Sequence, residues 1–166
     1  SPDYLATFDD TTMARFLAMR PGFDPSRARA VGNPSFDPIA TLDVLAMRMK
    51  TRATLGLTDN EIFVLYSGSS MAQFDLEGET LNNLIPWVKA RGVRFAFRFH
   101  PADVKNKPEE VERLRKRRID ELGAQLIETG ELKGLELAAG TDLLVTDYST
   151  EGVRPALAGI PVVFLM

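Results

Sequence analysis

The stretch Ile62-Phe63-Val64-Leu65-Tyr66-Ser67-Gly68-Ser69-Ser70 decides the fold. It holds an unbroken apolar and aromatic run that passes directly into small polar residues, which indicates a strand buried on both faces. Strands of this kind are typical of parallel sheets covered by helices. The polar residues that follow mark the carboxyl end of the strand, where open parallel sheets bind their ligands.

The same character returns in three further runs, at residues 95–99, 143–146 and 161–165. Weaker strand patterns lie at 4–8, 30–31 and 125–128. Helical spacing of apolar residues separates the runs, at 39–49 and 111–122, and also at 80–90 and 151–158, where Pro86 and Pro155 predict a kink or a break. Strands and helices that alternate in this way predict an α/β fold, a Rossmann-like parallel sheet with helices on both faces.

Composition limits the possible functions. A length of 166 residues suits a single core, and 45% hydrophobic with 26% charged residues is typical of a soluble globular chain. Twenty Lys plus Arg against 23 Asp plus Glu leave a net charge of −3, which disfavours a basic nucleic-acid-binding protein. The lack of cysteine excludes thiol catalysis and Cys-ligated metals, and together with the lack of a signal pattern it predicts a cytoplasmic location.

The two ends and one connector predict how the chain is organised. It begins at Ser1 without a methionine and stops at Met166 inside an apolar run, so we expect an excised piece of a longer protein. Prolines cluster between residues 20 and 38, which marks this stretch as the one plausible connector.

Three strand ends carry polar residues that are candidates for a ligand site. After the first strand, Ser67, Gly68 and Ser69 offer backbone N–H groups and hydroxyls for a phosphate, although a tight turn with a serine cap is the more common explanation of such a run. After the second comes His100, the only histidine, with Arg98 two residues before it. A lone histidine is usually structural, but the position of His100 at a strand end supports a functional role and a structural role about equally.

The third strand end opens into hydroxyls and carboxylates just before a helical pattern: Asp147, Ser149, Thr150 and Glu151. A helix N-terminus favours anions such as a diphosphate. Asp147 or Ser149 can also simply cap the helix. By contrast, the basic run at 115–118 is expected to be an ordinary solvated helix face.

Five ordered blocks resemble the C-terminal, nucleotide-donor-binding half of a GT-B transferase, the architecture shared by nucleotide-sugar glycosyltransferases and CDP-glycerol glycerophosphotransferases. The blocks are Val31-Gly32-Asn33-Pro34-Ser35-Phe36-Asp37, Leu65-Tyr66-Ser67-Gly68-Ser69, Arg98-Phe99-His100-Pro101, residues 142–150 and residues 158–164. Together they extend over about residues 31 to 166.

The resemblance implies a domain division and a set of site residues. Residues 1–25 are expected to be the last strand and helix of a missing N-terminal acceptor domain, and 26–166 a donor-binding domain truncated at its C-terminus. The donor would be a nucleotide-diphosphate-sugar or CDP-glycerol, with no further cofactor and no metal. Catalytic roles fall to His100 and Asp147, and donor binding falls to Ser67, Gly68, Ser69, Arg98, Ser149, Thr150 and Glu151.

One departure leaves the donor open. The family pattern has an acidic residue seven positions before the proline of the last strand, and here that position is Arg154, with Glu151 as a substitute one helical turn earlier. The function expected is donor binding in a cell-envelope or polysaccharide transferase, whose parent associates peripherally with a membrane. The alternatives are a nucleotide-binding or regulatory module without chemistry and half of a nucleotide-sugar epimerase.

Overall fold

The computed structural model describes residues 3–68, 79–121, 123–126, 132, 134–147 and 150–165. The chain divides into two compact units, Ser1–Thr41 and Leu42–Met166. That residues 1–25 come from an acceptor-binding domain stays a prediction.

The first unit is a small βαβ arrangement. Its elements are β1 (Leu5–Thr7), α1 (Asp10–Met19), a 3-10 turn η1 (Pro25–Arg27), β2 (Ala28–Ala30) and a 3-10 helix η2 (Pro34–Thr41). The two strands pair in parallel, with Leu5 opposite Ala28. The strand expected at 30–31 therefore lies slightly earlier in the chain. It ends before Gly32, whose backbone has a φ of 77°, outside the range of an extended strand.

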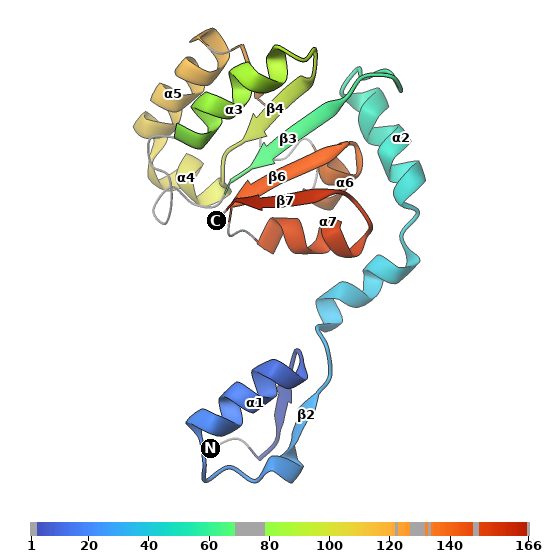
Figure 1. Ribbon diagram of the computed structural model, residues 1–166, viewed down its shortest axis with the longest axis vertical. Helices are drawn as coiled ribbons and strands as arrows, with labels where there is room; N and C mark the ends of the chain where they lie inside the picture. Colours follow the sequence, from blue (N-terminus) through green and yellow to red (C-terminus); the bar gives the residue numbers. More distant parts are fainter. Residues whose placement is uncertain are drawn as a thin grey trace. The chain divides into compact units, whose positions relative to one another are not determined.

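The second unit contains a parallel five-stranded sheet (Figure 1). Its strands are β3 (Phe63–Ser67), β4 (Arg94–Arg98), β5 (Gln125–Leu126), β6 (Leu143–Asp147) and β7 (Val162–Leu165). They lie in the order β5-β4-β3-β6-β7, so the chain first builds outward from β3 on one side and then returns to build outward on the other. This is the order of a Rossmann-type sheet, and it confirms the predicted fold class.

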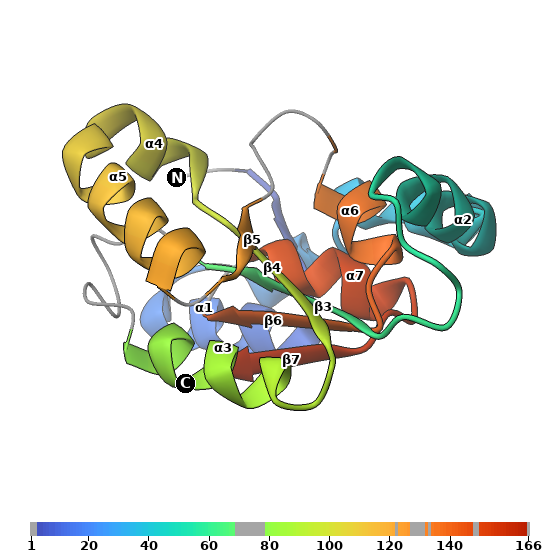
Figure 2. The ribbon, with the colours of Figure 1, turned by 90° about the horizontal axis from the view of Figure 1, so that it is seen from above.

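Side chains from alternate strand positions pack into two hydrophobic clusters, one on each face of the sheet. Val64 and Tyr66 belong to the first cluster, with α3 (Glu79–Lys89) and α5 (Pro108–Lys116) above them. Phe63 and Leu65 belong to the second, which is covered by α6 (Gly134–Ala139). Figure 2 shows α3 and α6 on opposite sides of the strands. Helices on both faces explain why the β3 run is apolar without alternation.

Two helices differ in detail from their sequence patterns. The pattern at 39–49 predicts one helix, but η2 ends at Thr41 and α2 (Val44–Thr54) starts anew, because Asp43 caps it by accepting a 2.9 Å hydrogen bond from the N–H of Ala46. By contrast, α3 continues through Pro86. Burial of Leu81, Ile85 and Val88 on one face offsets the backbone hydrogen bond that the proline removes.

The remaining helical elements are short. They are α4 (Pro101–Asn106), a π-type turn η3 (Arg117–Glu121), a 3-10 turn η4 (Thr150–Gly152) and α7 (Val153–Leu157). Pro155 lies in the first turn of α7, where its missing N–H has no intrahelical partner to lose. Over the part of the chain that the structure describes, no helix is both long and apolar enough to cross a bilayer.

An ion-pair network closes the amino edge of the sheet. The carboxylate of Asp142 accepts hydrogen bonds from the N–H of Phe63 (2.7 Å), from Arg48 (2.6 Å) and from Arg52 (3.3 Å). The Arg52 guanidinium is buried and also donates to the carbonyls of Thr58, Glu61 and Gly140. The network thus joins α2 to the first residues of β3 and to the segment that leads into β6.

We expect this network to make stability depend on pH. Burial raises the pKa of Asp142. The hydrogen bonds from Phe63 and Arg48 and the charges of Arg48 and Arg52 lower this pKa by more than burial raises it, so the net pKa is below the ordinary 3.8. The stabilisation is therefore complete above about pH 4 and is lost as pH falls through the lower, folded-state pKa.

Urea unfolding of wild type and Asp142→Asn measures this contribution. The variant should be less stable at pH 7, and the difference should shrink toward pH 3. Asp59→Asn, which alters an exposed aspartate in the turn before β3, is the matched control and should leave the profile unchanged. A difference that stays constant from pH 7 to pH 3 would contradict this account.

Candidate functional site

The candidate site lies at the carboxyl edge of the sheet, where β3 and β6 end side by side. After β3 the chain continues to β4 on one side, whereas after β6 it continues to β7 on the other side. Connections that leave two neighbouring strands in opposite directions open a crevice between them, the usual ligand site of such sheets. The residues at this point are Ser67 at the end of β3, Gly68 directly after it, and Asp147 at the end of β6.

Two side-chain hydrogen bonds tie these strand ends together. The Thr146 hydroxyl is fully buried and donates to the Ser67 carbonyl at 2.6 Å. The Tyr66 hydroxyl donates to Oδ2 of Asp147 at 3.3 Å. The first bond fixes the backbone where β3 ends, and the second fixes a carboxylate at the edge.

Gly68 packs closely on Tyr66, so a side chain there would press on the ring. A Cβ at this position would lie 3.0 Å from Cε1 and 3.1 Å from the hydroxyl oxygen of Tyr66. Its backbone does not adopt a positive φ, so the absence of a side chain serves the approach to the ring. The turn after β3 therefore rests on the tyrosine.

Arg98 supplies a positive charge on the β4 side of the crevice. It is the last residue of β4, stands in register with Ser67 and is half-buried. Within the described ranges, no hydrogen bond or ion pair engages its guanidinium. Its guanidinium is therefore available to bind an anion, and arginine can bind phosphate through two parallel hydrogen bonds.

His100 lies two residues beyond Arg98 and is the N-cap of α4. Its Nδ1 accepts a 3.1 Å hydrogen bond from the N–H of Ala102. A neutral imidazole whose Nδ1 accepts carries its proton on Nε2, so Nε2–H is a donor. No contact among the described residues uses it.

The structure places His100 outside the strand, since β4 ends at Arg98. Phe97 and Phe99 pack edge to face against each other, with ring centroids 5.3 Å apart, and the Arg118 guanidinium lies 5.2 Å from both rings. Their neighbour in this stack is an arginine from η3, which sequence periodicity did not indicate. That His100 faces a ligand shared with Asp147 stays a prediction.

The segment after β6 differs from its expectation. Thr150 begins η4, and α7 begins only at Val153. The N-cap of α7 is Gly152, which has no side chain with which to cap the helix. The described helical segment therefore begins at Thr150 as a 3-10 turn and becomes α-helical at Val153. The prediction for Ser149 lies outside the described residues. The Glu151 carboxylate lies against Gly134, the first residue of α6, so closely that a Cβ there would displace it.

Of the predicted site residues, the structure brings Ser67, Gly68, Arg98 and Asp147 to one edge of the sheet, and it places His100 just beyond that edge. Ser69 and Ser149 lie outside the described residues, as does the side chain of Thr150. Sequence reasoning missed Tyr66 and Thr146. Both are strand residues whose polar atoms need a partner when buried, and that need was the available signal.

Groups of opposite charge lie at different strands along this edge of the sheet. Arg98 and the Nε2–H of His100 favour an anion beside β4, whereas the Asp147 carboxylate beside β6 accepts hydrogen bonds from hydroxyl groups. In the described part of the chain, no three His, Asp or Glu residues gather as metal ligands do. That the reaction needs no metal or further cofactor stays a prediction.

Known sequence families and curated proteins provide no match to this chain. Several solved structures do match it. The wall teichoic acid polymerase TagF matches over 98% of this chain and 38% of its own, at 16% identity and a TM-score of 0.56. UDP-GlcNAc 2-epimerase from Neisseria meningitidis, bound to UDP-GlcNAc, matches over 98% and 44%, at 14% identity and a TM-score of 0.71. Heptosyltransferase II of E. coli matches over 72% and 37%, at 15% identity and a TM-score of 0.52.

These likenesses establish a Rossmann-like α/β fold of the kind found in GT-B nucleotide-sugar enzymes, as the sequence resemblance predicted. The neighbours include glycosyltransferases and the polymerase TagF. The chain spans about two fifths of the length of the structures it matches.

Gly152 offers a test of how the edge is built. A Cβ there would lie 2.7 Å from Cγ2 of Thr146 and 2.8 Å from the Phe164 ring, so η4 packs directly on β6 and β7. We expect Gly152→Ala to cost about 1–3 kcal/mol of unfolding free energy through overpacking. Gly22→Ala, at a glycine with open space around it, should be neutral by the same denaturant measurement. Equal effects of the two changes would contradict the packing.

Proposed function

We propose that this chain is the nucleotide-diphosphate donor-binding domain of a transferase of cell-envelope or polysaccharide synthesis, acting on a nucleotide-diphosphate-sugar or on CDP-glycerol. The observation that carries the proposal is the half-buried Arg98, which has no partner in the described part of the chain. It ends β4, in register with Ser67 and one strand from the switch point. The glycosyltransferases and the CDP-glycerol-soaked TagF among the structural neighbours support this class of donor.

The chemistry proposed is displacement at a sugar carbon or at a phosphorus. The acceptor oxygen forms a bond to that atom while the bond to the leaving phosphate oxygen breaks. The proton of the acceptor hydroxyl passes to water, and negative charge grows on the departing phosphate. Arg98 and the Nε2–H of His100 stabilise this charge, as fixed donors in a site sheltered from water do most effectively. Asp147 orients hydroxyl groups of the donor. The other half of the parent enzyme binds the acceptor and presents it to the donor.

A second candidate is half of a nucleotide-sugar epimerase. The TM-score of 0.71 with the UDP-GlcNAc 2-epimerase favours it, and Arg154 in place of the expected acid leaves the donor open. Both candidates predict a bound nucleoside diphosphate. They differ in that a transferase parent consumes donor only with an acceptor present, whereas an epimerase parent interconverts the sugar without one.

The binding test is a thermal shift of the chain against CDP, UDP, ADP, CDP-glycerol and UDP-GlcNAc. A ligand at 100 times its dissociation constant should stabilise the fold by about 2.7 kcal/mol. Arg98→Gln should weaken binding. Arg91→Gln is the matched control, because Arg91 precedes β4 at the opposite edge of the sheet and packs on Trp87. Failure of all five ligands to shift the melting temperature would overturn the proposal.

His100 provides a second prediction, because its two nitrogens have separable roles. His100→Asn keeps an N-cap acceptor and removes the Nε2 donor, so we expect weaker diphosphate binding with little change in unfolding free energy. His100→Ala removes both and should also cost about 1 kcal/mol of stability. If His100→Asn binds diphosphates as wild type does, His100 is only a cap.

The chain by itself should show no transferase turnover, because the acceptor-binding half is expected on the remainder of the parent. A donor-consumption assay with added acceptor and residues 1–166 checks this, with the full-length parent as positive control. Turnover by the chain alone would contradict the expected division of labour.

A further inference from the structure

Tyr66 brings a hydroxyl into a cluster whose other described members are apolar or phenyl side chains. The cluster on its face of the sheet is built from Val, Leu, Ile, Ala and Phe side chains, and Tyr66 alone adds a hydroxyl. Phenylalanine fills three comparable places there, Phe95, Phe97 and Phe99. Packing therefore accounts for the ring and leaves the hydroxyl unexplained.

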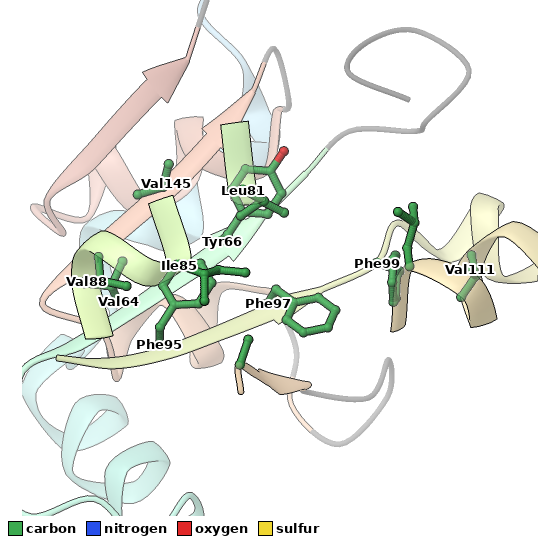
Figure 3. Close-up of a cluster of buried hydrophobic side chains, with 12 residues drawn as sticks. Val64, Tyr66, Leu81, Ile85, Val88, Phe95, Phe97, Phe99, Val111 and Val145 are labelled. Atoms are coloured by element: carbon green, nitrogen blue, oxygen red, sulfur yellow. The ribbon is translucent and has the colours of Figure 1, made fainter. Parts of the chain in front are cut away.

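The hydroxyl lies toward the carboxyl edge. Figure 3 shows the Tyr66 ring beside Leu81 with its oxygen at the outer end of the side chain. Tyr66 is next to last in β3, and its register partner on β6 is Val145, two residues before Asp147. From there the hydroxyl reaches Oδ2 of Asp147 at 3.3 Å, a long hydrogen bond between neighbouring strands.

The same side chain also supports the turn after β3. Gly68 lies beside the edge of the ring and its hydroxyl oxygen, so closely that a Cβ there would fit only if the ring moved slightly. One side chain thus touches both components at this end of the crevice: the turn expected near phosphates and the carboxylate expected near hydroxyl groups.

We propose that Tyr66 is a positioning residue, which orients the Asp147 carboxylate to accept a hydrogen bond from a hydroxyl of the nucleotide donor. This inference rests on the proposed function. An ionised carboxylate accepts hydrogen bonds and repels phosphate, so its partner on the donor is a ribose, sugar or glycerol hydroxyl. The phosphates lie instead toward Arg98 and His100. The Tyr66–Asp147 pair then distinguishes hydroxyl-bearing donors from bare diphosphate.

Tyr66→Phe tests this, because it keeps the ring under Gly68 and deletes the hydroxyl. The probes are CDP-glycerol and UDP-GlcNAc, which carry hydroxyls, and inorganic pyrophosphate, which carries none. We expect Tyr66→Phe to weaken binding of the better nucleotide about three- to tenfold, as expected for the loss of one ordinary hydrogen bond, and to leave pyrophosphate binding unchanged. Thr51→Val, which deletes a buried hydroxyl bonded to Glu136 O near the other edge, should change neither.

A double-mutant cycle with Asp147→Asn shows whether Tyr66 acts through the carboxylate. The Tyr66→Phe effect should largely disappear in the Asp147→Asn background. An equal loss in both backgrounds, an equal loss for pyrophosphate, or a loss of stability alone would overturn the positioning role while the proposed function stands. If wild type binds neither nucleotide, the proposed function fails and the inference fails with it.

Discussion

The structure depends on the burial of β3 on every side. Its five residues are all buried, its edges pair with β4 and β6, and its alternate side chains enter the clusters on the two faces. A strand so enclosed is apolar over most of its length, and its polar residues, Tyr66 and Ser67, lie at its carboxyl end. At the amino end Asp142 and Arg52 close the sheet, which leaves the carboxyl end for the ligand site.

Much of this architecture follows from sequence because continuous apolar runs are uncommon outside buried parallel strands. The runs at 62–66, 95–99, 143–146 and 161–165 each correspond to a strand, and even the weak pattern at 125–128 does so in part. What periodicity could not resolve is where elements break. Residues 39–49 have one helical spacing, yet the Asp43 cap begins a separate helix within them. A single side-chain hydrogen bond outweighs the pattern there.

The candidate site divides in the same way. Ser67, Arg98 and Asp147 were predictable because each ends a strand, and parallel strands bring their ends to one edge. Tyr66 and Thr146 were not, since within a strand an aromatic or β-branched residue indicates only burial. Their roles depend on partners 81 and 79 residues away in the chain. Such pairings are set by strand order, which a single sequence does not specify.

The most direct test of the account is to locate nucleotide binding on the sheet. Two-dimensional ¹H–¹⁵N NMR of the chain, titrated with CDP and with UDP, reports on each backbone amide. The account predicts saturable shifts centred on residues 67–68, 98–102 and 147–152, with the amino edge around Asp142 and Phe63 unchanged. Shifts centred on that amino edge, or none with either nucleotide, would contradict it.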